Sequence, residues 1–161
     1  MPEGHVDQLL DILKTKTSAE VYSDNFNKVR YATDASIYQI MPFGILIPKT
    51  KSDLIETINY AREIRIPLLA RGGGTSQCGQ TVNNAIVIDN SKYLNKVLDF
   101  NKEKMTCIVE PGIVLDELNR FLKPYGLWFP VDVSTSSRAT IGGMAGNNSC
   151  GGRSIRYGMM R

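Results

Sequence analysis

The feature that most constrains the fold is a strand–helix–strand order that ends in a run of glycines. Residues 44–47 form a short apolar strand that Pro48 ends. Thr50 and Asp53 then predict an N-cap pair for a helix over residues 51–65, which carry apolar side chains at helical spacing. The stretch "PLLARGGG" then reads as a second strand that leads directly into Gly72, Gly73 and Gly74. This order predicts a βαβ unit with parallel strands.

The rest of the chain predicts short elements of both kinds. Helical spacing marks residues 5–16 and the segment from Val114 to Leu122, and a second short helix is expected over 18–23. Residues 27–36 are polar, and we expect them to be irregular. A β-branched run covers 85–89, and "NKVLDFNKEKMTCIVEPG" predicts a hairpin around 101–104. The predicted fold class is therefore α+β with an α/β-like start, two small mixed sheets and flanking helices.

Ten of the 14 glycines fall in two stretches, four in residues 71–80 and six in residues 141–158. Glycine lets a backbone approach a ligand closely, and consecutive N–H groups can bind phosphate oxygens. Both stretches could also be plain surface turns. The first stretch is neither a Walker A loop nor a GxGxxG fingerprint. The residues alone indicate two loops on one elongated nucleotide cofactor, without acid–base machinery of their own.

Charge, cysteines and hydropathy exclude several classes. The net charge is +3 without a basic run, which argues against a nucleic-acid partner. Three widely spaced cysteines argue against a disulfide framework or a structural zinc site, and no metal site is expected. No apolar stretch reaches the roughly 20 residues of a transmembrane helix, and no secretory signal is visible. We therefore expect a cytoplasmic protein.

Three segments in order carry a family resemblance: "PFGILIPKTKSDLIETINYAREIRIPLLARGGGTSQCGQ", "VEPG" and "TIGGMAGNNSCGGRSIRYG". Together they resemble the FAD-binding domain of the vanillyl-alcohol-oxidase superfamily, also called PCMH-type. The similarity is greatest to FAD-linked dehydrogenases of D-2-hydroxy acids, namely glycolate oxidase, D-lactate dehydrogenase and D-2-hydroxyglutarate dehydrogenase. The last segment is most similar to forms fused to an iron–sulfur module.

The resemblance implies a domain division and a set of cofactor contacts. It covers about residues 27–161, which leaves residues 1–26 as an N-terminal helical extension. It implies that the glycine loop holds the FAD pyrophosphate, that the "EPG" turn lies near the adenosine half, and that the third segment runs along the flavin and its ribityl phosphate. Arg71 is expected to anchor the loop rather than to contact phosphate. The implied contacts are Gly72, Gly73, Gly74, Thr75, Ser76, Gln77, Gly79, Gln80, Pro111, Gly112, Thr140, Gly142, Gly143, Asn147 and Asn148.

Two departures from the family pattern shape the expected chemistry. Thr75 stands where some relatives attach FAD through a histidine, and His5 is the only histidine, so we expect non-covalent FAD. Attachment through a cysteine such as Cys150 is less firmly excluded. Family members also continue with more of the FAD domain and then a substrate domain. This chain is therefore expected to be an incomplete FAD domain that is inactive alone, without catalytic residues and with the substrate, electron acceptor or iron–sulfur module downstream.

Two alternative functions remain open at this point. The chain could be a nucleotide-binding or structural module that binds no flavin by itself. It could also belong to another flavoenzyme of the same fold, such as a UDP-N-acetylenolpyruvoylglucosamine reductase. Its second glycine-rich stretch fits the hydroxy-acid branch better. The parent enzyme is expected in the cytoplasm or peripheral to the inner membrane.

Overall fold

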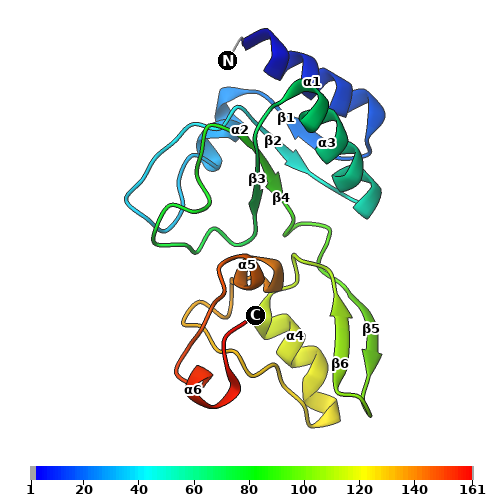
Figure 1. Ribbon diagram of the computed structural model, residues 1–161, viewed down its shortest axis with the longest axis vertical. Helices are drawn as coiled ribbons and strands as arrows, with labels where there is room; N and C mark the ends of the chain where they lie inside the picture. The colour runs from blue at the N-terminus through cyan, green and yellow to red at the C-terminus, as the bar shows by residue number, and fades with distance from the viewer. Residues whose placement is uncertain (1–2, 161) are drawn as a thin grey trace. The chain divides into compact units, whose positions relative to one another are not determined.

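The computed structural model describes residues 3–160, which form two compact units, unit 1 up to Tyr93 and unit 2 from Leu94 onward. Unit 1 holds α1 (Glu3–Lys16), β1 (Glu20–Tyr22), α2 (Asn25–Arg30), β2 (Gly44–Ile47), α3 (Lys51–Ile64), β3 (Leu68–Arg71) and β4 (Ile86–Asp89). Unit 2 holds β5 (Val97–Asn101), β6 (Thr106–Val109), α4 (Leu115–Leu122), the 3₁₀ helix η1 (Lys123–Tyr125), α5 (Ile141–Gly146) and α6 (Ser154–Tyr157). Figure 1 labels all of these helices and strands except η1.

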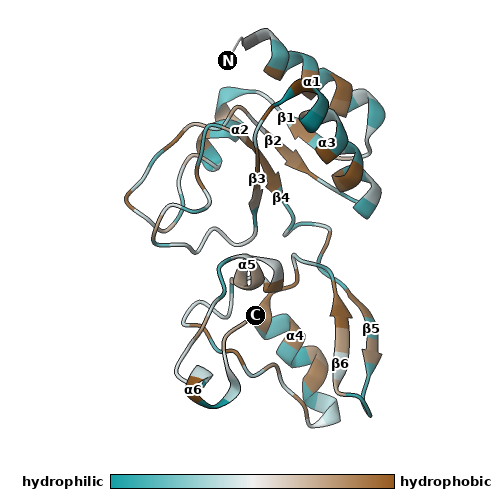
Figure 2. Cartoon of the chain, viewed as in Figure 1, coloured by the Kyte–Doolittle hydropathy of each residue, from teal (hydrophilic) through white to brown (hydrophobic). Residues whose placement is uncertain are grey.

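Unit 1 is built on a four-stranded mixed sheet in the order β1-β2-β4-β3. β2 and β3 both pair with β4 in parallel, while β1 pairs with β2 antiparallel. This confirms the predicted βαβ unit, with α3 as the crossover between the parallel strands β2 and β3. Every residue of β2 and β4 is buried, as expected for inner strands that are covered on both faces, and Figure 2 colours both strands as hydrophobic.

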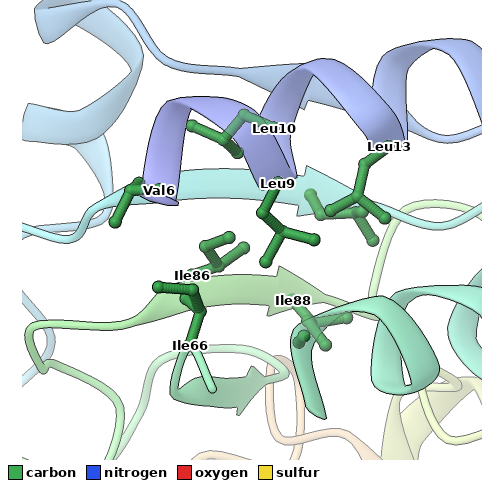
Figure 3. Close-up of a cluster of buried hydrophobic side chains, with 9 residues drawn as sticks. Val6, Leu9, Leu10, Leu13, Ile66, Ile86 and Ile88 are labelled. Atoms are coloured by element: carbon green, nitrogen blue, oxygen red, sulfur yellow. The ribbon is translucent and has the colours of Figure 1, made fainter. Parts of the chain in front are cut away.

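Helices α1 and α3 supply the core on one face of this sheet. The buried cluster joins four residues of α1 to Leu46 of β2 and to Ile86 and Ile88 of β4. Figure 3 shows these side chains of α1, which are Val6, Leu9, Leu10 and Leu13, beside Ile66, Ile86 and Ile88. The N-terminal helix is therefore an integral part of the core of unit 1. The division at residue 26 expected from the sequence stays a prediction.

Helix α3 begins at a reciprocal capping box, as the pair Thr50 and Asp53 predicts. The Thr50 hydroxyl accepts from the Asp53 N–H at 3.2 Å, and the Asp53 carboxylate accepts from the Thr50 N–H at 2.9 Å. Asp53 also accepts from the backbone and hydroxyl of Ser18, at 2.8 Å and 2.9 Å. One buried carboxylate thus ties the start of α3 to the segment that follows α1.

Two sequence predictions in unit 1 are wrong. Residues 20–22 form the edge strand β1 instead of part of a helix over 18–23. The helix begins later, where the Asp24 side chain accepts from the Asn27 N–H and starts α2. Residues 27–30 are therefore helical rather than irregular. The three-residue strand β1 is stabilised by pairing with β2. A segment this short has no hydrophobic periodicity from which a strand could be predicted.

Unit 2 contains the predicted hairpin and the predicted helix. β5 and β6 pair antiparallel around a turn in which the Lys104 N–H donates to the Asn101 side chain at 2.8 Å. α4 buries Leu115, Leu118 and Leu122 in a cluster with residues that include Val131, Ile141 and Met144. The small, polar stretch after residue 130 still contributes two short helices, α5 and α6.

Candidate cofactor site

The glycine loop, residues 72–80, leaves the sheet at the carboxyl end of β3. Arg71 ends β3 opposite Asp89 of the parallel strand β4, and the Arg71 carbonyl accepts from the Asn90 N–H at 3.0 Å. Ligands of open α/β sheets bind outside the carboxyl ends of the strands, so the loop starts where a ligand site is expected. The glycines therefore follow the carboxyl end of β3, on the side of the sheet where ligands of such sheets bind.

Gly74 is packed directly against the Arg71 guanidinium. Its φ of +63° lies in the left-handed region, and a Cβ at this position would lie 2.6 Å from Nη2 of Arg71. A side chain at position 74 would therefore be unfavourable for two reasons: the left-handed backbone and the clash with Arg71. The close approach also places a positively charged group directly beneath the loop backbone.

The far end of the loop is fixed by Tyr38 and by a local turn. Gly79 has a φ of +74°, and a Cβ there would lie 2.6 Å from Cδ2 of Tyr38. The Ser76 hydroxyl accepts from the Cys78 N–H at 3.2 Å. Thr75 and Ser76 are half-buried, whereas Gly73 and Gln77 are exposed. The loop thus offers an exposed backbone at its tip and two hydroxyl side chains beside it.

The second glycine-rich stretch begins as the short helix α5. Its N-cap is Thr140, whose hydroxyl accepts from the Gly143 N–H at 3.3 Å. Thr140 is buried, while Gly143 and Asn147 are exposed. The implied contacts Thr140, Gly142 and Gly143 therefore lie together in the first turn of this helix.

The "EPG" turn packs against that same turn of α5. The Gly142 N–H donates to the Pro111 carbonyl at 2.8 Å, and the Ile141 N–H donates to the Ile113 carbonyl at 2.9 Å. A Cβ at Gly142 would lie 2.6 Å from the Pro111 Cβ. The structure thus brings together Pro111, Gly112, Thr140, Gly142 and Gly143 within unit 2, although about 30 residues separate the two segments in the sequence.

The chain after α5 folds back on the segment near residue 132. Asn148 has a φ of +47°, and the Ser149 N–H donates to the Met144 carbonyl at 2.9 Å. The Arg153 N–H donates to the Asp132 carboxylate at 3.0 Å, and Gly151 lies against the Asp132 backbone without room for a side chain. Asp132 therefore holds the C-terminal part of the predicted segment, a role that no motif around residue 132 indicates.

The implied contacts thus fall into two groups. Gly72, Gly73, Gly74, Thr75, Ser76, Gln77, Gly79 and Gln80 form the loop of unit 1, and Pro111, Gly112, Thr140, Gly142, Gly143, Asn147 and Asn148 belong to unit 2. That both groups bind a single FAD stays a prediction.

The residues of unit 1 fit the chemistry of a pyrophosphate group. At Gly74 the backbone has a left-handed conformation and lies close to the Arg71 guanidinium, both of which favour glycine, and the next two residues carry hydroxyls. Backbone N–H groups and hydroxyls are the donors that phosphate oxygens accept. In the loop, therefore, the backbone rather than a lysine or a metal would do the binding.

Four ionisable groups near the start of the loop and its far end set the local electrostatics: Arg71, Asp34, Asp89 and Tyr31. Burial lowers the pKa of Arg71, an effect that Asp34 and Asp89 oppose. Burial raises the pKa of Asp34, but hydrogen bonds from Ser36 and Thr81 outweigh it, so the pKa lies below its ordinary value. Burial and a 2.7 Å hydrogen bond to Asp89 raise the pKa of Tyr31. The loop thus starts at the half-buried Arg71 guanidinium, and the nearby carboxylates of Asp34 and Asp89 are both hydrogen-bonded.

Other site types find little support in the described residues. Within residues 3–160, no three His, Cys, Asp or Glu side chains are grouped so that they could hold a metal ion. The same residues include no helix of the length and apolarity that crossing a membrane requires. Cys78 and Cys150 are exposed thiols, and His5 is exposed on α1.

Known proteins are similar in sequence to this chain over most of its length. D-2-hydroxyglutarate dehydrogenase of Haemophilus influenzae is 37% identical over 156 residues, which cover 95% of this chain and 15% of that protein. Glycolate oxidase subunit GlcD of Bacillus subtilis is 32% identical over 140 residues, covering 85% of this chain and 30% of that protein. The chain thus spans about a sixth to a third of the length of these relatives.

Solved structures show the same fold at lower sequence identity. An alkyldihydroxyacetonephosphate synthase superposes with a TM-score of 0.85 at 21% identity, over 95% of this chain and 31% of that one. p-Cresol methylhydroxylase superposes with a TM-score of 0.73 at 15% identity, over 91% and 30%. These likenesses confirm the predicted fold class.

A family model described as "FAD binding domain" matches residues 42–161. The match covers both glycine-rich segments and the "EPG" turn between them, and it confirms the resemblance drawn from those motifs. The chain therefore belongs to the FAD-binding domain family, whose cofactor is FAD.

Proposed function

We propose that this chain is the FAD-binding part of a dehydrogenase that oxidises a D-2-hydroxy acid, with D-2-hydroxyglutarate the favoured substrate over D-lactate and glycolate. The observation that carries the proposal is the 37% identity to D-2-hydroxyglutarate dehydrogenase across 95% of the chain. Bound FAD would supply the hydride acceptor for the oxidation of the alcohol carbon.

The residues of this chain would bind and orient the cofactor. In unit 1 the loop of Gly72–Ser76, continued by Gln77, Gly79 and Gln80, would hold the pyrophosphate. In unit 2 the turn at Pro111 and Gly112 and the first turn of α5 would hold the rest of the dinucleotide. FAD would be bound without a covalent link, because Thr75 stands in the loop where a histidine would be needed.

The remaining parts of the reaction would lie in the portion of the relatives that this chain does not span. A general base must lie within hydrogen-bond reach of the substrate hydroxyl. We place that base, the hydroxy-acid pocket and the electron acceptor, an iron–sulfur module, in that portion. The parent enzyme would work in the cytoplasm.

Titration of the purified chain with FAD tests the cofactor assignment. We expect quenching of flavin fluorescence, competition by ADP, and loss of binding in Gly73→Asp, which places a carboxylate against the pyrophosphate. Gly4→Asp is the matched control, since a Cβ at Gly4 meets no atom within 4 Å on the exposed side of α1. Equal binding by both variants would contradict the assignment of the loop.

The substrate is tested in the whole enzyme with an artificial electron acceptor. We expect D-2-hydroxyglutarate to give the highest kcat/KM among D-2-hydroxyglutarate, its L enantiomer, D-lactate and glycolate. A preference for the L enantiomer, or a whole protein that binds no FAD, would overturn the proposal.

A further inference from the structure

The segment of residues 31–38, here called the bracing segment, contacts Gly74 and Gly79 of the glycine loop and the two residues that flank the loop, Arg71 and Thr81. It connects α2 to the chain before β2, and no motif in it indicates a cofactor role. The Ala35 N–H donates to the Gly74 carbonyl at 3.2 Å, and the Tyr38 ring covers Gly79. These contacts join residues about 40 positions apart.

The first strong link is the fork of the Arg71 guanidinium. Nη2 donates to the Thr33 carbonyl at 2.9 Å, and Nη1 donates to the carbonyls of Tyr31 and Thr81 at 3.3 Å and 3.2 Å. Its Cζ also lies 5.3 Å from the centre of the Tyr31 ring. One planar cation thus joins the bracing segment to the residue that follows the loop, while Gly74 rests on it.

The second link is the carboxylate of Asp34. Its Oδ2 accepts from the Thr81 hydroxyl at 2.9 Å and from the Thr81 N–H at 3.4 Å, and its Oδ1 accepts from the Ser36 N–H at 2.8 Å. Asp34 therefore closes the loop at residue 81 and shapes its own segment at the same time. Arg71 and Asp34 thus both hold Thr81, the residue that follows the loop.

Ordering a glycine-rich loop is costly in conformational entropy, and a ligand that must order its own site binds more weakly. We propose that the bracing segment, through Arg71 and Asp34, orders the glycine loop before any cofactor arrives, which makes these two side chains positioning residues for the pyrophosphate. Neither side chain needs to touch the ligand. The inference rests on the proposed function only for the identity of the ligand, because the ordering is a property of the protein alone.

Hydrogen exchange of the cofactor-free chain tests the ordering directly. Arg71→Lys keeps the charge but loses the planar fork, and Asp34→Ala removes the acceptor of Thr81. We expect the amides of residues 72–80 to exchange about tenfold faster or more in either variant, while the amides of β2 and β4 keep their protection. The matched controls are Arg62→Lys and Asp7→Ala, which make the same changes at exposed helical positions.

The affinity for FAD and ADP is a second measurement, and it would stay unchanged if Arg71 and Asp34 had a purely structural role. If only about a tenth of the molecules hold the ordered loop, the dissociation constants for FAD and for ADP each rise about tenfold. In the variants, added FAD should then protect residues 72–80 far more strongly than it does in the unaltered chain. The double variant should lose less affinity than the product of the two single losses, because Arg71 and Asp34 both bind Thr81 and either substitution already releases it.

The outcomes separate this inference from the proposed function. Unchanged exchange of residues 72–80 in both variants would overturn the inference, as would independent, multiplicative losses of affinity. An unaltered chain that binds neither FAD nor ADP would contradict the proposed function. In that case the exchange of the cofactor-free loop still decides the inference.

Discussion

Gly142 and Pro111 are locked together: the Gly142 N–H donates to the Pro111 carbonyl at 2.8 Å, and a Cβ on Gly142 would lie 2.8 Å from that same oxygen. The approach of the Pro111 carbonyl that allows this hydrogen bond therefore also excludes a side chain at position 142. Through this contact the "EPG" turn and the N-terminus of α5 keep a fixed relation. At position 142 of unit 2, packing against Pro111 thus requires glycine.

We expect Gly142→Ala to destabilise the protein by about 1–3 kcal/mol, because the new methyl group meets backbone atoms that cannot turn aside. Gly146→Ala, at the end of the same helix with open space around it, should instead stabilise it by about 0.5 kcal/mol or more. Chemical denaturation of the two variants measures both free energies of unfolding. Equal effects would contradict the packing argument.

Gly74→Ala should reduce both stability and affinity for FAD. A left-handed conformation costs an alanine about 1–2 kcal/mol, and here the methyl group would also displace the Arg71 guanidinium. Gly126→Ala is the matched control, because its φ of +73° is similar and its surroundings are open. We expect comparable strain at Gly126 with unchanged FAD affinity, measured by flavin fluorescence. A loss of affinity in Gly126→Ala would show that strain alone accounts for the effect at Gly74.

Because of Glu20, the stability of unit 1 is expected to fall as the pH drops below 4.5. Hydrogen bonds from Lys92, Tyr93 and Tyr22 lower the pKa of its carboxyl from 4.5 to about 2. The pKa is lower in the folded state, so the contribution of Glu20 is full above pH 4.5 and is lost as the pH falls from there toward 2.

We therefore expect Glu20→Gln to flatten the decline of the unfolding free energy between pH 4.5 and pH 2. Lys92→Met should flatten it in part, because it removes the Lys92 ammonium, 2.8 Å from both carboxylate oxygens. Denaturation series at several pH values measure these slopes. An unchanged slope in Glu20→Gln would contradict the assignment.

The flavin of the whole enzyme should separate from the polypeptide on acid denaturation. No histidine stands in the glycine loop, and His5 lies on α1. After acid precipitation we expect the yellow colour in the supernatant and none on the protein pellet. Flavin that stays on the pellet, and that Cys150→Ser releases, would instead indicate a cysteinyl bond.

The sequence predicted the elements whose signals are local. A signal of a few neighbouring residues is enough for three of these elements: the capping pair Thr50 and Asp53, the apolar run of β4 and the polar turn after Asn101. β1 escaped prediction because a three-residue strand depends on its partner β2. α5 escaped it because three of its six residues are glycines, which disfavour helices, and only the N-cap Thr140 marks its start.

The same distinction applies to the site. The glycine loop and the "EPG" turn are readable as motifs, whereas Asp34, Tyr38 and Asp132 act through contacts with residues far along the chain. Nothing in the composition of residues 31–38 distinguishes them from an ordinary polar connection. Their relation to residues 71–81 exists only once the sheet has formed.

The burial of α1 sets a limit on where this domain can be cut. The family match begins at residue 42, so a protein shortened to that match would lack α1, β1 and α2. Leu46, Ile86 and Ile88 would then face water where Leu9, Leu10 and Leu13 now cover them, and β2 would become an uncovered sheet edge prone to self-association. The smallest portion that can be produced in a folded state is thus larger than the portion that the cofactor motifs occupy.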